Sequence, residues 1–287
     1  MPLNFTEIST GERIGSTVLA RNILLAATQD VDAELNLKIQ QVKNWRKEYL
    51  GVYRSLAKTE FYQEQNGLEI ARIGLDLLAK SIRDDSGRDL NQIVEAGWVG
   101  AAEVETFIVS GTSPLRSLSI TGISSLTDAA QIWAHEKLAE PGVIGSFKFL
   151  DAHKKLPIAM DLLIALAGGA EYAPTKHWLA VGGTVAVVAR SNPARWLDLI
   201  NHARNSGGTL LVPVLKSRVP QSAIALTDEA IAQNAGLDIC DDAEALAGWV
   251  AALSMTRKER IVLGQYAYAP GAKHILVQAV QDALAAK

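Results

Sequence analysis

A turn of small residues follows the short apolar run DLLIALA (residues 161–167). Its members are Gly168, Gly169 and Ala170. Backbone without bulky side chains lets a ligand approach closely, and the free N–H groups of the helix that should begin near Thr175 favour an anion such as pyrophosphate. Residues 172–174 stand where a complete G-x-G-x-x-G pattern would place further glycines. We therefore weigh a ligand-binding loop, which we favour, against a turn that only joins strand to helix.

A second polar set follows the β-branched run TVAVVA (residues 184–189). It consists of Arg190, Ser191 and Asn192. An acidic residue at the end of the second strand of a dinucleotide-binding sheet holds the ribose hydroxyls of NAD, whereas a guanidinium and a hydroxyl suit the 2′-phosphate of NADP. If a dinucleotide binds, we expect NADP. The alternative is an ordinary exposed arginine at a strand end.

Two loops repeat a pattern of tyrosine, proline, lysine and histidine. YAPTKHW covers residues 172–178, and YAPGAKHI covers residues 268–275. The second belongs to the segment from Gln265 to Lys273, which we expect at the same edge of the sheet as the glycine turn. The pattern has two interpretations, a shared polar site or two similar strand-to-helix turns without a common function.

Short apolar runs that alternate with helical patterns should position these loops. The expected strands are residues 161–167, 184–189, 209–214 and 260–264, and the expected helices are residues 175–181, 193–203, 241–253 and 272–286. This alternation is typical of a parallel sheet covered on both faces, which binds ligands outside the carboxyl ends of its strands, where the strand order switches. The predicted class is α/β, with a Rossmann-like parallel sheet in the C-terminal half after a mostly α-helical N-terminal region.

The N-terminal region shows a helical periodicity. Apolar residues from Leu35 to Leu56 recur at steps of three and four, which predicts one helix of roughly six turns. A second helix should begin near Gly67. An aromatic cluster either lines a pocket or, as we favour, packs between these helices; its members are Trp45, Tyr49, Tyr53, Phe61 and Tyr62.

The middle of the chain contains shorter elements and a predicted boundary. Further helices are expected at residues 90–96 and 126–138, and short strands at residues 105–110 and 118–121. Proline and glycine accumulate at residues 140–146, which breaks the pattern. We expect this segment to separate a mainly helical region (1–145) from a nucleotide-binding domain (146–287).

Composition restricts the classes of partner. Hydrophobic residues make up 48% and charged residues 21% of the 287 residues, as in an ordinary globular protein, and the net charge is −3. No strongly basic segment is present, which argues against nucleic acid as a primary partner. No apolar run is long enough to cross a membrane and no signal peptide is evident, so we expect no membrane partner and a cytoplasmic location. A single cysteine excludes an internal disulfide, and the histidines show no metal-ligand spacing.

Over residues 162–267 the chain resembles the first half of a short-chain dehydrogenase/reductase domain. The resemblance rests on the glycine turn, the strand ending VAVVARS, and the segments GGTLLVPV, DDAEALAGWVAAL and RIVLGQYAYA. The VVARS ending is similar to that of NADPH-using members, including ketoreductase domains of fatty-acid synthases. The resemblance implies cofactor contacts at Gly168, Gly169, Arg190 and Ser191. Neighbouring candidates at the same edge are Ala170, Thr175, Asn192 and Gln265.

The same resemblance implies a catalytic Tyr-x-x-x-Lys pair, in which the lysine lowers the pKa of a tyrosine that acts as general acid. Tyr172 and Lys176 have this spacing but occupy the phosphate-loop position. Tyr268 and Lys273 are one residue too far apart. The later strands of the family have no counterpart after Lys287, so we expect either that residues 105–110 complete the sheet or that hydride chemistry is absent.

Three functions are consistent with these observations. The one we favour is an NADP-dependent oxidoreductase that reduces a carbonyl or enoyl group of a small or medium organic substrate, with substrate contacts from the N-terminal helices. The second is a non-catalytic Rossmann-like module that uses those helices for a partner or a homo-oligomer such as a homodimer. The third is a transferase for another nucleotide-bearing ligand, although Arg190 argues against S-adenosylmethionine.

Overall fold

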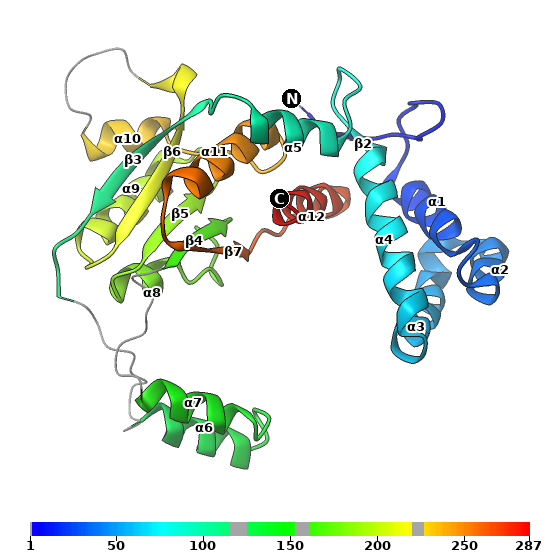
Figure 1. Cartoon of the computed structure of the whole chain (residues 1–287), viewed down its shortest axis with the longest axis horizontal. Coiled ribbons are helices and arrows are strands. Elements are labelled where there is room, and N and C mark those ends of the chain that lie inside the picture. Colours follow the sequence, from blue (N-terminus) through cyan, green and yellow to red (C-terminus); the bar gives the residue numbers. More distant parts are fainter. Residues whose placement is uncertain (1, 115–124, 153–160, 220–226) are drawn as a thin grey trace. The chain divides into compact units, whose positions relative to one another are not determined.

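The computed structural model describes residues 2–114, 125–152, 161–219 and 227–287 (Figure 1). These residues form two compact units, each built from separate stretches of chain. The first unit comprises Met1–Glu103, Asp238–Ala252 and Ala267–Lys287, and the second comprises Val104–Leu237 and Leu253–Tyr266. The sequence suggested one division at residue 145, whereas the chain passes between the units more than once. The strand expected at residues 118–121 lies outside the described residues.

The first unit begins with a helical bundle. It contains α1 (Ser16–Thr28), α2 (Ala33–Gln41), α3 (Trp45–Tyr62) and α4 (Glu64–Ser81). The prediction of one continuous helix from Leu35 to Leu56 is wrong, because the backbone is extended at Val42 and Asn44 and separates α2 from α3. The apolar periodicity still faces one core, in which Ile39, Val42 and Val52 are buried together. The second helix, expected near Gly67, is α4.

Asp32 connects α2 and α3, the two helices that replace the single predicted helix. One carboxylate oxygen accepts a hydrogen bond from the Leu35 amide at 2.9 Å and so caps α2. The other accepts from the Thr59 hydroxyl, in the last turns of α3, at 2.7 Å. A local capping residue thereby connects two helices that the apolar pattern alone would have joined into one.

The aromatic cluster of α3 does not form a helix–helix core, contrary to the interpretation we favoured. Tyr49, Tyr53, Phe61 and Tyr62 are exposed. Trp45 is partly buried against the core of the N-terminal helices. The predicted packing fails because α3 turns its Val52 side to the core and leaves these rings on other sides of the helix.

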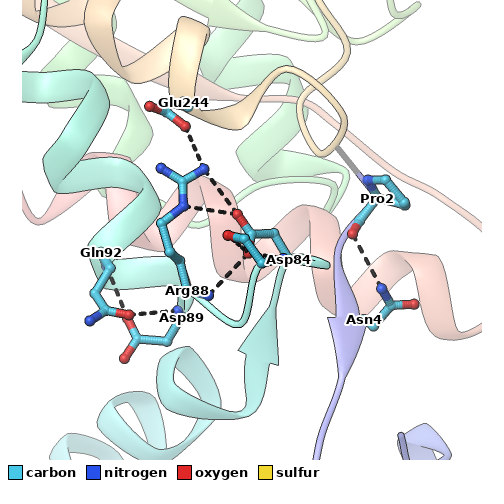
Figure 2. A network of polar contacts seen from close by, with 8 residues as sticks. Pro2, Asn4, Asp84, Arg88, Asp89, Gln92 and Glu244 are labelled. Carbon is cyan, nitrogen blue, oxygen red and sulfur yellow. Dashed lines mark hydrogen bonds and ion pairs between the residues drawn. The ribbon is translucent and has the colours of Figure 1, made fainter.

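The remainder of the first unit surrounds a small polar network. A strand pair, β1 (Asn4–Phe5) and β2 (Ile82–Arg83), leads into α5 (Leu90–Val99), and the C-terminal part contributes α12 (Ala272–Ala285) and most of α11 (Ala243–Thr256). Figure 2 shows Asp84 and Arg88 in the loop before α5, with Glu244 from the start of α11. Arg88 bonds to Asp84 through Nε at 3.0 Å and reaches Glu244 at 2.8 Å.

The Asp84 carboxylate is buried, and both of its oxygens accept hydrogen bonds. It accepts hydrogen bonds from the amide and hydroxyl of Ser86 and from the amide of Arg88. Burial alone would raise the pKa of Asp84, but the hydrogen bonds from Ser86 and Arg88 outweigh it and hold that pKa below its ordinary value. The charged form is therefore favoured in the folded state.

We expect Asp84→Asn to lower the free energy of unfolding at pH 7 by about 2 kcal/mol, because charge-assisted hydrogen bonds are lost from a buried group. Since the folded-state pKa is depressed, the contribution of Asp84 is present above its ordinary pKa and is lost as the pH falls through the folded value. Urea unfolding at several pH values should show the difference from wild type shrinking below about pH 4. Asp85→Asn, at an exposed neighbour, is the control. Equal stability of Asp84→Asn and wild type at pH 7 would contradict this account.

The second unit is built on a five-stranded sheet with the order β3-β6-β5-β4-β7. Its strands are β3 (Val104–Ser110), β4 (Asp161–Leu166), β5 (Thr184–Val188), β6 (Thr209–Leu215) and β7 (Arg260–Gln265). The last four are parallel to one another, which confirms the predicted alternating pattern. β3 joins antiparallel to β6, so residues 105–110 do complete this sheet, in agreement with one of the two expectations.

Helices between the strands cover one face of this sheet. They are α8 (Thr175–Ala180), α9 (Pro193–Arg204) and the unpredicted α10 (Asp228–Asn234). Trp196, Ile200 and Leu179 from these helices share a core with alternate residues of β4, β5 and β6. Every residue of β4 is buried, which means that both faces of this strand are covered.

Two further helices, α6 (Leu126–His135) and α7 (Val143–Ala152), pack against each other. Trp133 and Phe147 meet edge to face, with ring centroids 5.8 Å apart. Residues 140–146, expected to be a domain boundary, are instead the turn of this helical hairpin and the first turn of α7. Pro141 and Gly142 lie in this turn directly before α7, and Gly145 lies in α7 itself.

Candidate functional site

The glycine turn leaves the carboxyl end of β4 through an unusual backbone conformation. Ala167 has a φ of 64°, in the left-handed region that non-glycine residues rarely adopt. The Gly168 amide donates to Val188 O at 3.1 Å, and the buried Thr175 hydroxyl donates to Gly168 O at 2.6 Å. Thr175, predicted as a cofactor contact, thus holds the turn closed from within.

Gly168 and Gly169 differ in the space around them. A Cβ on Gly168 would lie 3.0 Å from the Cβ of Ala165 and from both Cγ atoms of Val187, whereas a Cβ on Gly169 would meet nothing within 4 Å. A side chain at position 168 would therefore crowd the packing of the turn against β5. Gly169 is exposed and offers open backbone to a ligand, and Ala170 follows it, its amide bonded to Ala167 O.

Replacing each glycine in turn should show which of the two is needed for the packing of the turn. We expect Gly168→Val to lower the free energy of unfolding by about 1–3 kcal/mol through overpacking. Gly169→Ala should leave stability unchanged within about 0.5 kcal/mol. Thermal and urea unfolding of both variants would measure this. A well-tolerated Gly168→Val would show that the turn does not have the close packing described here.

The second predicted segment lies at the carboxyl end of β5. Its backbone is held on two sides: Trp196 Nε1 donates to Arg190 O at 3.2 Å, and the Leu237 amide donates to Ala189 O at 2.9 Å. The side chains of Arg190 and Ser191 are exposed. Among the described residues, the Arg190 guanidinium forms no ion pair.

Asn192, a further predicted cofactor contact, has a local partner. Its Oδ1 accepts from the Arg195 amide at 3.1 Å, and it caps α9, where Pro193 occupies the first turn. Capping uses the side-chain oxygen that would otherwise accept a hydrogen bond from a ribose hydroxyl. Asn192 therefore fixes the start of α9 and thereby the direction in which the chain leaves Arg190.

Gln265 ends β7 on the other side of β4. It pairs in register with Leu166, and the amide of the next residue, Tyr266, donates to Leu166 O at 3.0 Å. The chain goes from β4 to β5 and β6 in one direction, whereas β7 lies on the opposite side of β4. The carboxyl ends of β4 and β7 thus form a switch point of strand order, and the glycine turn begins there.

The lysines of both predicted tyrosine–lysine pairs contact carboxylates. Tyr172 is 89% exposed, and Lys176 bonds to Asp198 Oδ2 at 2.8 Å. Lys273 lies 3.7 Å from a carboxylate oxygen of Asp238.

Tyr268 belongs, with Lys273, to the first unit, whereas the glycine turn belongs to the second. Its ring is 80% exposed, and its centroid lies 5.2 Å from that of His274. Both candidate lysines, Lys176 and Lys273, therefore contact a carboxylate and not a tyrosine hydroxyl in the contacts given above.

Two features, one in each unit, were not predicted from the sequence. Gly236 has a φ of 119°, and a Cβ there would lie 2.7 Å from the Ser191 amide nitrogen, so only glycine lets this loop cross the end of β5. A surface hollow lies in the first unit between α5 and α12, lined by Val94, Glu95 and Ala283 among others. The glycine before LDIC was the available signal for the first feature; the second depends on tertiary packing alone.

Cys240 offers no nucleophile. Burial, reinforced by the neighbouring carboxylate of Asp238, raises the pKa of its thiol to about 12. The thiolate is the reactive form, and at neutral pH almost none is present.

Comparison with protein-family models, curated proteins and solved structures found no match for this chain. Among the described residues, no helix is long and apolar enough to cross a membrane.

Proposed function

We propose that the chain is an NADP-dependent oxidoreductase whose cofactor lies at the carboxyl edge of the second unit's sheet, in a Rossmann-like arrangement. The observation that carries this proposal is the switch of strand order between β4 and β7, with the glycine turn directly after β4. Doubly wound sheets bind ligands at such switch points. The open backbone of Gly169 meets the requirement that a pyrophosphate approach the chain closely.

The free charge of Arg190 supports NADP over NAD. Its guanidinium is exposed at the end of β5, and Ser191 beside it provides a hydroxyl. Together they suit a 2′-phosphate, which Arg190 would bind through charge-assisted hydrogen bonds. The hydrogen bonds to Arg190 O and Ala189 O hold the backbone in place, so little ordering of the backbone is needed on binding.

The reaction we propose is reduction of a carbonyl or enoyl group. The bound reduced nicotinamide would supply a hydride to the substrate carbon, and the protein must supply the proton that completes the reduction. Tyr172, which belongs to the same unit as the glycine turn, would donate this proton through its hydroxyl, assisted by Lys176. For Lys176 to act, its contact with Asp198 must be exchanged for one with the tyrosine.

A non-catalytic nucleotide-binding module is the second candidate. It is favoured by one observation, the engagement of both candidate lysines by carboxylates. It shares the cofactor site and differs only in lacking the proton donor, so activity measurements separate the two.

Titration of the chain with NADPH and NADH tests the cofactor site. We expect saturable binding of both with a clear preference for NADPH, and Arg190→Ala should reduce that preference about tenfold or more, as loss of a charge-assisted contact implies. Arg72→Ala, at an exposed arginine of α4, is the matched control and should bind like wild type. If neither nucleotide binds, the oxidoreductase proposal is wrong.

The proton donor is tested by oxidation of NADPH in the presence of carbonyl and enoyl compounds. Tyr172→Phe should lower kcat about 100-fold with little change in NADPH affinity, because a general acid contributes roughly that factor. Tyr62→Phe, at another exposed tyrosine, is the control. A wild-type rate in Tyr172→Phe would exclude this tyrosine, and NADPH binding without any turnover would favour the non-catalytic module.

A further inference from the structure

Helix α3 carries apolar side chains on a side that the rest of its unit does not cover. Val52 and Thr59 face the N-terminal core and are buried. On other sides Leu50 is 56%, Tyr53 is 44% and Phe61 is 80% exposed. Apolar residues gathered on one exposed surface, and not scattered singly, are characteristic of interaction sites.

The exposed residues have the spacing of a coiled-coil interface. We define the outer seam of α3 as a row of five exposed residues at alternating steps of four and three. They are Arg46, Leu50, Tyr53, Ala57 and Glu60. This is the spacing of the a and d positions of a heptad, which keeps one side of a helix facing a partner helix. The row has apolar residues in its middle, and Phe61 extends this apolar surface.

The two ends of the outer seam carry opposite charges. Arg46 begins the row and Glu60 ends it, about 21 Å away at a rise of about 1.5 Å per residue. Within the described part of the chain, neither side chain takes part in an ion pair. Both charges therefore remain available to a partner at either end of an apolar centre.

This charge pattern is complementary to itself when one copy is reversed. In an antiparallel pair related by a two-fold axis near Tyr53, the Arg46 end of each seam meets the Glu60 end of the other. A parallel pair would instead bring like charges together at both ends. The same surface can thus serve on both copies, as an isologous dimer interface requires.

We propose that the chain forms a homodimer in which the outer seams of two α3 helices pack antiparallel. Leu50, Tyr53 and Ala57 supply the apolar centre, and reciprocal Arg46–Glu60 pairs at the two ends set the direction of the helices. This interface uses residues of α3 alone, so it is independent of the proposed cofactor site.

Charge reversal tests the pairing directly. Sedimentation velocity of the full chain over a range of concentrations should show a dimer for wild type. Arg46→Glu and Glu60→Arg should each raise the dimer dissociation constant about tenfold or more, because each places like charges together at both ends. The double variant should return the constant close to the wild-type value. A wild type that is monomeric at all concentrations, or a double variant no tighter than the singles, would overturn the proposal.

A second pair of variants tests the apolar centre. Leu50→Lys should abolish the dimer, whereas Ile132→Lys, at a side chain of α6 that is 46% exposed, should leave it intact. Circular dichroism of each variant establishes that it is folded. A folded Leu50→Lys variant that dimerises like wild type would place the interface elsewhere and contradict the proposal.

Discussion

The pairing of β4 with a strand on each side determines how the second unit is arranged. It pairs with β5 on one side and β7 on the other, and all its residues are buried. The register of β7 is fixed at the opposite end by Arg260, which bonds to both carboxylate oxygens of Asp161 at 2.9 and 2.8 Å. The pairing with β5 and β7 therefore fixes the position of the sheet edge at the carboxyl end of β4.

The turn at that edge contains backbone strain. Ala167 and Lys137 are the non-glycine residues with positive φ in the described part of the chain. The left-handed conformation costs an alanine about 1 kcal/mol or more, and such strain persists only where surrounding contacts impose it. Here those contacts are the hydrogen bonds of Gly168 with Val188 and Thr175. Strained backbone is concentrated at functional sites, which supports a ligand-binding role for this turn.

The sequence predicted the elements whose signal is local. The strands β4 to β7 were found because each is a short apolar run, and a glycine pair follows β4 and precedes both β5 and β6. The break between α2 and α3 was missed because the apolar periodicity continues through Val42 and faces the same core on both sides of the break. The helix α10 was missed because seven residues are too few to show a period, although Thr227 caps it. The exposed surface of α3 could not be predicted, since which side of a helix is buried depends on its neighbours.

The sequence predicted where the candidate site lies better than it predicted which contacts its residues make. Gly168, Gly169, Arg190 and Gln265 all lie at carboxyl ends of strands, because parallel strands bring those ends to one edge. Thr175 and Asn192, predicted as cofactor contacts, also support the turn and the start of α9 through local hydrogen bonds that the sequence did not indicate. The tyrosines and lysines could not be placed by spacing, because the carboxylates that engage the lysines are distant in sequence.

Hydrogen–deuterium exchange with and without NADPH measures the central claim at the residues concerned. A dinucleotide at the β4–β7 switch point should slow exchange in residues 167–172 and 189–192, which form the glycine turn and the end of β5. Unchanged exchange in both segments at saturating NADPH, or protection confined to the helices of the first unit, would contradict the account.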